Sequence, residues 1–258
     1  MFEKQLLITL VGFGKMGKAI KHITDHDHSV KINYVIDLEN NIHGSAFSHS
    51  SFLQSDVVID FSHPSAVVST IKSCIAAGKP IVVGTTGWLE FQPEIIDLVQ
   101  KNGAKLLYGS NYSLGVQLFN KLIKQASLLF GQSSLFDSAM HEVHHTQKAD
   151  APSGTALTLA NTYLQHATTK KVLQTNIPTH EKVESDSLYV TSQRLGGTFG
   201  EHELRIQSEW DDIQIKHTAR SREGFAAGAV RAAKWLSNKK EPGFYLLEDV
   251  AEEVIMQS

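Results

Sequence analysis

Short, uninterrupted apolar runs recur through the first 110 residues, and most are followed by a stretch with helical periodicity. An apolar run of roughly four to eight residues, bounded by turn residues, is typical of a strand buried on both faces. The runs lie at residues 6–11, 32–36, 56–61, 80–83 and 104–108. Their alternation with amphipathic segments predicts an α/β fold with a doubly wound parallel sheet and right-handed crossovers.

The first predicted strand runs directly into a glycine-rich turn. The turn reads Gly12-Phe13-Gly14-Lys15-Met16-Gly17, a G-x-G-x-x-G pattern that precedes an amphipathic run. In this setting the glycines allow a tight turn, backbone approach to a pyrophosphate and close packing of helix on strand. Asp37 ends the second strand about 20 residues later, where a carboxylate accepts hydrogen bonds from the adenosine ribose. The combination predicts a Rossmann-type dinucleotide site. The alternative is a glycine-rich turn without a ligand.

No basic residue follows Asp37, since residues 38–41 are Leu, Glu, Asn and Asn. A 2′-phosphate is usually held by arginine or lysine at this place. We therefore expect NADH or NADPH as the cofactor, with NADH preferred or equal. His63 or a distant lysine could still hold the phosphate.

Two further loops follow predicted strands. Gly84-Thr85-Thr86-Gly87 lies at a strand's carboxyl end, where open parallel sheets place ligands, although an ordinary turn would have the same composition. Ser110-Asn111-Tyr112-Ser113-Leu114-Gly115 breaks the alternation. We place a domain boundary and a hinge there.

Beyond residue 115 the pattern predicts a second, α+β domain with a mixed sheet. Helices are expected at 115–130, from Ser153 onward and at 224–236, and strands at 136–145, 188–193, 201–208 and 213–219. The tail after 242 is expected to return to the first domain. Polar residues 45–51 and 168–186 are expected to form surface segments.

Composition restricts the classes of function. The chain has 258 residues, is 41% hydrophobic and carries a net charge of −3, so it can bury a sizeable core and lacks the basic excess of nucleic-acid-binding proteins. Its one cysteine, Cys74, lies in a predicted helix and reads as a buried structural thiol. No apolar run reaches the ~18 residues of a membrane span. We expect a cytoplasmic protein with no nucleic-acid or membrane partner.

Residues 142–155 concentrate groups that can bind and protonate an anion. His144 and His145 can exchange protons near neutral pH, and Lys148 can hold a carboxylate. Ser153-Gly154-Thr155 opens a predicted helix, whose free N–H groups and positive dipole end suit a carboxylate or phosphate. The alternative is a pair of structural histidines at a strand end.

The same stretch spells H-E-x-x-H from His141 to His145, which on a helix would give two zinc ligands. On the predicted strand these residues would lie roughly 13 Å apart, at ~3.3 Å per residue. This is too far for one zinc ion. We therefore expect no metal.

The stretch from Glu142 to Ala156 resembles the signature of the 4-hydroxy-tetrahydrodipicolinate reductase family, also called dihydrodipicolinate reductases. The resemblance extends over nearly the whole chain. It includes residues 12–17, 60–62, 84–87, 111–115, Arg194, Gly197, Gly200, His202, and 217–229.

The resemblance implies a dinucleotide domain of residues 1–112 plus 224–258, interrupted by a substrate-binding and tetramerisation domain of residues 113–223. It implies reduction of a cyclic dicarboxylate imine in lysine biosynthesis by a homotetramer. By the same resemblance His144 is the proton donor, Lys148 assists, and the carboxylates are held by His145, Ser153, Gly154 and Thr155. The implied cofactor contacts are Gly12, Phe13, Gly14, Lys15, Met16, Gly17, Asp37, Gly84, Thr85, Thr86, Ser110, Asn111 and Ser113.

The chain departs from the family pattern in two places, both of which bear on the cofactor. The glycine-rich loop is one residue shorter than the commoner form, and the usual basic residue after Asp37 is missing. Two other functions share the first domain. One is another NAD-dependent dehydrogenase of small amino or hydroxy dicarboxylic acids. The other is a non-catalytic NAD-sensing protein, which would lack the acid–base residues that stand in this chain.

Overall fold

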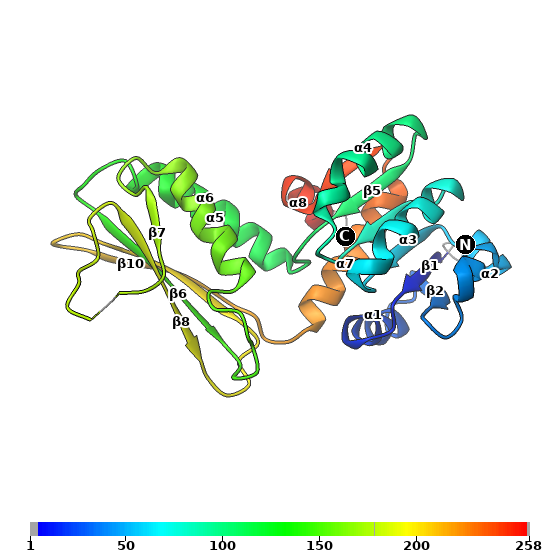
Figure 1. Ribbon diagram of the computed structural model, residues 1–258, viewed down its shortest axis with the longest axis horizontal. Helices are drawn as coiled ribbons and strands as arrows, with labels where there is room; N and C mark the ends of the chain where they lie inside the picture. Colours follow the sequence, from blue (N-terminus) through cyan, green and yellow to red (C-terminus); the bar gives the residue numbers. More distant parts are fainter. Residues whose placement is uncertain (1–4, 178, 257–258) are drawn as a thin grey trace. The chain divides into compact units, whose positions relative to one another are not determined.

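The computed structural model describes residues 5–177 and 179–256, and the chain divides into two compact units. Unit 1 combines the chain up to Leu114 with the chain from Arg222 onward, and unit 2 is Gly115–Ser221. Figure 1 shows both units, coloured from the first residues of the chain (blue) to the last (red).

Unit 1 is built on a six-stranded parallel sheet with the order β11-β5-β4-β3-β1-β2. The strands are β1 (Leu6–Val11), β2 (Val30–Ile36), β3 (Val57–Asp60), β4 (Ile81–Val83), β5 (Lys105–Tyr108) and β11 (Gly243–Leu246). The predicted doubly wound sheet is confirmed, because apolar side chains pack on both of its faces.

Helices cover the two faces of this sheet. One face carries α1 (Lys15–Asp25), α7 (Glu223–Asn238) and α8 (Leu247–Met256). The other carries α3 (Pro64–Ala76) and α4 (Gln92–Lys101), which η2 (Leu89–Phe91) precedes. Cys74 of α3 is a buried free thiol, and burial raises its pKa well above the usual range. β11 pairs in parallel with β5, so the last part of the chain completes the sheet.

Small residues let α7 lie close to the backbone of its neighbours. Ala226, Ala229 and Ala233 are buried in the core. At Gly228 a Cβ atom would lie only 1.8 Å from the carbonyl oxygen of Tyr112. The close packing of this helix therefore depends on the absence of a side chain at that position.

Most residues of 45–51 are exposed, as expected, but they do not form the expected loop. This segment forms η1 (Ile42–Ser48) and the start of α2 (Ser50–Gln54). Ala46 and Phe52 are buried in the core beside the sheet, and the ring of His49 stacks on Tyr34. Burial of these apolar side chains outweighs the loop tendency of the serines around them.

Unit 2 contains a five-stranded mixed sheet with the order β10-β9-β6-β8-β7. The strands are β6 (Asp137–His144), β7 (Val172–Gln174), β8 (Ser187–Arg194), β9 (Glu201–Gln207) and β10 (Asp212–Thr218). β6 runs parallel to β8 and antiparallel to β9. The helices α5 (Leu114–Phe130) and α6 (Gly154–His166) pack on one face of this sheet (Figure 1).

Most of the described residues within 168–186 are exposed, as expected, but the segment also contains the edge strand β7, which pairs with β8. Buried Lys170 of this segment forms an ion pair with Asp137. Among the described residues, no helix combines the length and apolar character that a membrane crossing requires.

Candidate active site

At one end of the sheet of unit 2, the strands change from apolar to charged and polar side chains. On the face covered by α5 and α6, β6 presents Met140 to the apolar core and then Glu142 and His144. β8 passes in the same way from Val190 to Arg194, which pairs with His144 in the strand register. The cross-strand partner of Glu142 is His202 on β9. Three strands therefore bring a carboxylate, a guanidinium and two imidazoles together.

Glu142 is the centre of this cluster and has no solvent exposure. Its Oε1 accepts the backbone N–H of Ser153 at 3.0 Å and lies 3.3 Å from both terminal nitrogens of Arg194. Its Oε2 lies 3.2 Å from Nδ1 of His144 and 3.8 Å from Nε2 of His202. One oxygen is thus occupied by fixed donors, and the other faces the histidines.

His144 is buried, and its two ring nitrogens face different surroundings. Nδ1 points to Glu142, whereas Nε2 faces Gly200, where a Cβ atom would come within 3.0 Å. Glycine at position 200 therefore keeps a carbon atom out of close contact with Nε2. Nε2 is the ring nitrogen that is not directed at Glu142.

The loop after β6 is tied to the same cluster by Arg194. The guanidinium donates from Nε to the carbonyl of Lys148 at 3.2 Å and from a terminal nitrogen to the carbonyl of Asp150. The Lys148 ammonium lies 2.8 Å from the Asp150 carboxylate. Arg194 therefore positions both the carboxylate of Glu142 and the segment that carries Lys148.

The predicted helix start at Ser153 is confirmed. The Ser153 hydroxyl accepts the backbone N–H of Ala156 at 3.1 Å and lies 3.4 Å from Nε2 of His202. The Lys148 ammonium, and after it the Gly154 backbone N–H, lower the pKa of the Asp150 carboxyl. Asp150 thus lies at the amino end of α6, where an external carboxylate would also be attracted.

The surroundings of Glu142 and His202 shift their pKa values in ways that give the two side chains different charges near neutral pH. Burial by itself would raise the pKa of Glu142, but hydrogen bonds from His144, Ser153 and Ser192 outweigh it and hold the pKa far below the usual range. Burial, followed by the neighbouring His144, lowers the pKa of His202 to about 4. Near neutral pH, Glu142 is therefore a carboxylate and His202 a neutral imidazole.

Residues 141–144 of the H-E-x-x-H pattern lie on β6 and His145 directly follows the strand, so the pattern lacks the helical spacing that would bring His141 and His145 to one zinc ion. His141 is on the opposite face from His144, and its Nδ1 contacts the hydroxyl of Thr191 at 2.7 Å. A different trio has the spacing of metal ligands, since ligand atoms of Glu142, His144 and His202 lie within 4.8 Å of one another. Arg194 already supplies a cation to this carboxylate.

In unit 1 the glycines of the G-x-G-x-x-G turn serve different purposes. A Cβ at Gly12 would lie 2.4 Å from the carbonyl oxygen of Phe61, and one at Gly17 would lie 2.3 Å from that of Gly12. At Gly14 a Cβ would meet no protein atom within 4 Å. The protein's own packing requires the first and third glycines, whereas the middle one leaves open space suited to a pyrophosphate.

We expect Gly14→Ala to fold normally and to raise the KM for the dinucleotide by roughly 10-fold, because its methyl group occupies only the open space. Gly17→Ala, in the same turn, should instead lower the free energy of unfolding by about 1–3 kcal/mol. Urea unfolding and cofactor titration separate the two effects. A Gly14→Ala variant with normal cofactor affinity would contradict a pyrophosphate at this turn.

The loops at the carboxyl ends of β3 and β4 are joined by a buried carboxylate. Asp60 has no solvent exposure and accepts hydrogen bonds from the hydroxyls of Thr85 and Ser62. Burial raises the pKa of Asp60. The side chain of Thr85 therefore holds the loops together, while the neighbouring Thr86 is exposed.

The other predicted cofactor residues also lie at the carboxyl ends of the strands. Asp37 directly follows β2, and its backbone N–H donates to the Asn40 side chain. Asn111 follows β5, and its side-chain oxygen accepts the backbone N–H of Ser113 at 2.9 Å. Exposed Ser110 adjoins this turn, and Gly84 follows β4. Phe13 and Met16 pack partly against the core, and Lys15 is exposed.

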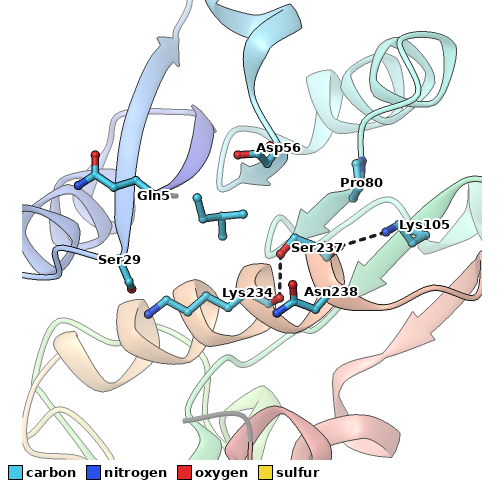
Figure 2. Close-up of a pocket in the computed structure, with 9 residues that line it drawn as sticks. Gln5, Ser29, Asp56, Pro80, Lys105, Lys234, Ser237 and Asn238 are labelled. Carbon is cyan, nitrogen blue, oxygen red and sulfur yellow. Dashed lines mark hydrogen bonds between the residues drawn. The ribbon is translucent and has the colours of Figure 1, made fainter. Parts of the chain in front are cut away.

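A pocket of about 620 Å³ lies at the opposite end of the strands, where they begin. Figure 2 shows its lining residues, which include Asp56 and Lys105 near the starts of strands and Lys234 near the end of α7. The ammonium of Lys234 pairs with Asp27, and that of Lys105 donates to the carbonyl of Lys239. Open parallel sheets bind dinucleotides at the carboxyl ends of their strands, so we do not assign the cofactor to this pocket.

Sequence reasoning did not assign roles to Glu142, Arg194 or His202, which form the buried cluster with His144. The available signal was strand alternation, because Glu142 and His144 are two residues apart and must share a face. The cross-strand partners could not be assigned without the register.

Comparison with known proteins was made for the whole chain. The family model "Dihydrodipicolinate reductase, N-terminus" matches residues 6–112, and "Dihydrodipicolinate reductase, C-terminus" matches residues 115–251. A relative from Christiangramia forsetii named 4-hydroxy-tetrahydrodipicolinate reductase is 34% identical over 96% of this chain and 98% of its own length. A relative of the same name from Sulfurimonas denitrificans is 40% identical over 78% of this chain and 79% of its own.

Solved structures show the same fold. The dipicolinate-bound dihydrodipicolinate reductase from Paenisporosarcina sp. TG-14 matches with a TM-score of 0.77 and 22% identity, over 96% of this chain and 100% of that one. An amine dehydrogenase from Mycobacterium smegmatis matches with a TM-score of 0.60 and 12% identity, over 96% of each chain. Both family models and the curated relatives together cover nearly all of the sequence, and the chain belongs to the dihydrodipicolinate reductase family.

Proposed function

We propose that this protein reduces 4-hydroxy-tetrahydrodipicolinate, with loss of water, to tetrahydrodipicolinate, using NADH or NADPH, in the diaminopimelate pathway to lysine. The relatives described above are named for this reaction, as 4-hydroxy-tetrahydrodipicolinate reductases. The structural observation that carries the proposal is the buried Glu142–His144 pair at the amino end of α6, close to Lys148. It combines a proton donor with groups that attract a carboxylate.

The glycine turn of unit 1 fits a dinucleotide, because Gly14 leaves open space at a strand's carboxyl end. NADH or NADPH, when bound, supplies the hydride. We propose that Gly12, Gly14, Gly17, Asp37 and Thr86 contact it, together with Phe13, Lys15, Met16, Gly84, Thr85, Ser110, Asn111 and Ser113. The Thr85 hydroxyl is held by Asp60, so we expect this residue to act through its backbone.

Hydride addition to a conjugated imine leaves negative charge on the carbon skeleton, and a positioned acid must neutralise it. We propose that Nε2 of His144 donates this proton. It is the ring nitrogen that faces Gly200 and is not directed at Glu142. Lys148 assists by placing its positive charge near the reacting group.

We propose that the substrate carboxylates are held by His145, Ser153, Gly154 and Thr155. The amino end of α6 supports this role through its dipole and backbone donors. In the described structure Asp150 interacts with Lys148 and this helix end. A substrate carboxylate must therefore share these donors with Asp150 or displace it.

We expect kcat/KM for NADH to equal or exceed that for NADPH, because no basic side chain stands directly after Asp37. Leu38 is 88% exposed, so Leu38→Arg should fold normally. It should improve the relative efficiency with NADPH by roughly 10-fold through a charge-assisted contact with the 2′-phosphate. Steady-state kinetics with both cofactors measure this. A strong preference of the unaltered protein for NADPH would show that another base, such as His63, holds the phosphate.

We propose a homotetramer that associates through unit 2. Both helices of unit 2 pack on one face of its sheet, which leaves the face carrying His141 and Tyr189 without a helix among the described residues. Light scattering combined with size-exclusion chromatography tests this. A monomer at assay concentration would contradict it.

The reaction itself is tested with substrate produced in situ by the preceding synthase, while NADH and NADPH oxidation is followed. Absence of oxidation with both cofactors would contradict the proposed function. A panel of other small amino and hydroxy dicarboxylic acids distinguishes a different dehydrogenase.

A further inference from the structure

We propose that Glu142 is a positioning residue for the proton donor: its Oε2 holds Nδ1–H of His144, so that Nε2 carries the proton that is transferred. The inference rests on the proposed function, in which His144 acts as the acid. A carboxylate that does not touch the substrate thereby fixes the tautomer of that acid.

The division of labour between the two oxygens supports this role. Oε1 is held by the backbone of Ser153 and by Arg194, which fixes the plane of the carboxylate. Oε2 is fully buried and lies 3.2 Å from Nδ1 of His144, and the Ser192 side chain also donates to this carboxylate. Neither Oε2 nor Nδ1 has a well-aligned hydrogen bond to another described residue. Small rotation of the imidazole would align them, which makes them partners for each other.

The same carboxylate also faces His202, but the geometry favours His144. The distance from Oε2 to Nε2 of His202 is 3.8 Å, and that nitrogen lies 3.4 Å from the Ser153 hydroxyl. Burial and the neighbouring imidazole keep His202 neutral, as its lowered pKa of about 4 indicates. Of the two rings, His144 is therefore the nearer partner of Oε2.

The charges around the pair are consistent with this assignment. Those that face it are Arg194 from β8, His202 from β9, Lys148 from the following loop, and beyond them His217 from β10. With Arg194 and Glu142 cancelling, a protonated His144 gives the cluster a net positive charge. A dicarboxylate substrate favours that sign, and the pairing leaves the ring charged without leaving Glu142 uncompensated.

The consequence for the reaction is a fixed direction of proton flow. After Nε2 gives up its proton, His144 keeps Nδ1–H because Oε2 still accepts it. The ring is then a neutral imidazole of defined tautomer, and it regains a proton only at Nε2. Buried carboxylates that orient a catalytic or metal-binding histidine act in this way in other proteins.

The test is Glu142→Gln, which keeps the size and one oxygen for Ser153 but removes the charge. We expect kcat to fall by roughly 10- to 100-fold with the substrate KM changed less than about 3-fold. The alkaline limb of kcat against pH should move to lower pH by about 1–3 units, because the charged imidazole loses its partner. Glu142→Asp, which keeps the charge, should restore the position of the limb with a lower kcat.

The matched control is Glu203→Gln on β9. Glu203 follows His202, pairs with Arg205 at 2.9 Å and lies in register with His141, which is on the opposite side of the sheet from His144. Removing this charge should leave the pH profile unchanged. A pH profile of Glu142→Gln that matches the unaltered protein would overturn the proposal.

A second measurement does not depend on activity. Nitrogen-15 NMR of the histidine rings should show Nδ1–H as the neutral tautomer of His144, and the titration of this ring should shift to lower pH in Glu142→Gln. An Nε2–H tautomer would overturn the proposal even if no Glu142 variant folds. If the unaltered protein fails to reduce the substrate, the proposed function fails, while the NMR result still decides the role of Glu142.

Discussion

Replacing His144 by glutamine is expected to lower kcat by about 10²-fold or more, with little change in the KM for the substrate. A positioned general acid contributes roughly 10²- to 10⁴-fold to a rate. Glutamine retains a polar group beside Gly200 but cannot deliver a proton from Nε2. The loss should therefore appear in the chemical step. Steady-state kinetics with substrate made in situ measure kcat and KM separately.

Thr155→Val is the comparison variant. It removes a hydroxyl from the first turn of α6. We expect it to raise the substrate KM by roughly 10- to 100-fold while kcat changes little, since a lost hydrogen bond to a charged group costs about 1.5–3 kcal/mol. If His144→Gln left both kcat and KM unchanged, His144 would not be the acid.

Gly228→Ala is expected to destabilise unit 1 by about 1–3 kcal/mol or more, which is the cost of overpacking a tight core. The new Cβ would lie 1.8 Å from the carbonyl oxygen of Tyr112, a backbone atom that cannot move aside alone. The hydroxyl of Tyr112 is itself held by the carbonyls of Val83 and Leu107. Helix α7 must therefore shift away from the sheet.

The same helix provides the control. A Cβ at Gly224 would meet no atom within 4 Å, so Gly224→Ala should leave stability unchanged or raise it by up to about 1 kcal/mol. Tryptophan fluorescence in urea suits both variants, because Trp88 and Trp235 of unit 1 are buried whereas Trp210 of unit 2 is 73% exposed. Equal stability of the two variants would contradict the close packing at Gly228.

The sequence was most informative where burial dictates composition. The strands of unit 1 are buried on both faces, so they stand out as continuous apolar runs, as at Val57–Asp60. The glycine turn after Val11 could be predicted for the same reason, since backbone contacts exclude side chains at Gly12 and Gly17.

The residues around Glu142 that come from other strands were harder to predict from the sequence, because their positions depend on the register of the strands. His144, Lys148 and Ser153 are close in sequence and were found together. Arg194 and His202 come from β8 and β9, and only the pairing of these strands with β6 brings them to Glu142. Composition also misled where it was mixed. The serines of residues 45–51 concealed Ala46, whose burial is set by tertiary contacts.

The interruption of unit 1 has a consequence for biosynthesis on the ribosome. The chain leaves unit 1 at Leu114 and returns at Arg222, and β11, α7 and α8 complete its sheet and one of its apolar faces. At about 5–20 residues per second, unit 2 takes roughly 5–20 s to synthesise. During this interval β5 pairs with β4 but lacks β11 on its other side, and one face of the nascent sheet lacks two of its helices. Unpaired edges and bare apolar faces are the surfaces that chaperones bind and aggregates form from. Synthesis of the final segment therefore pairs the free side of β5 and covers the bare apolar face of the nucleotide-binding unit.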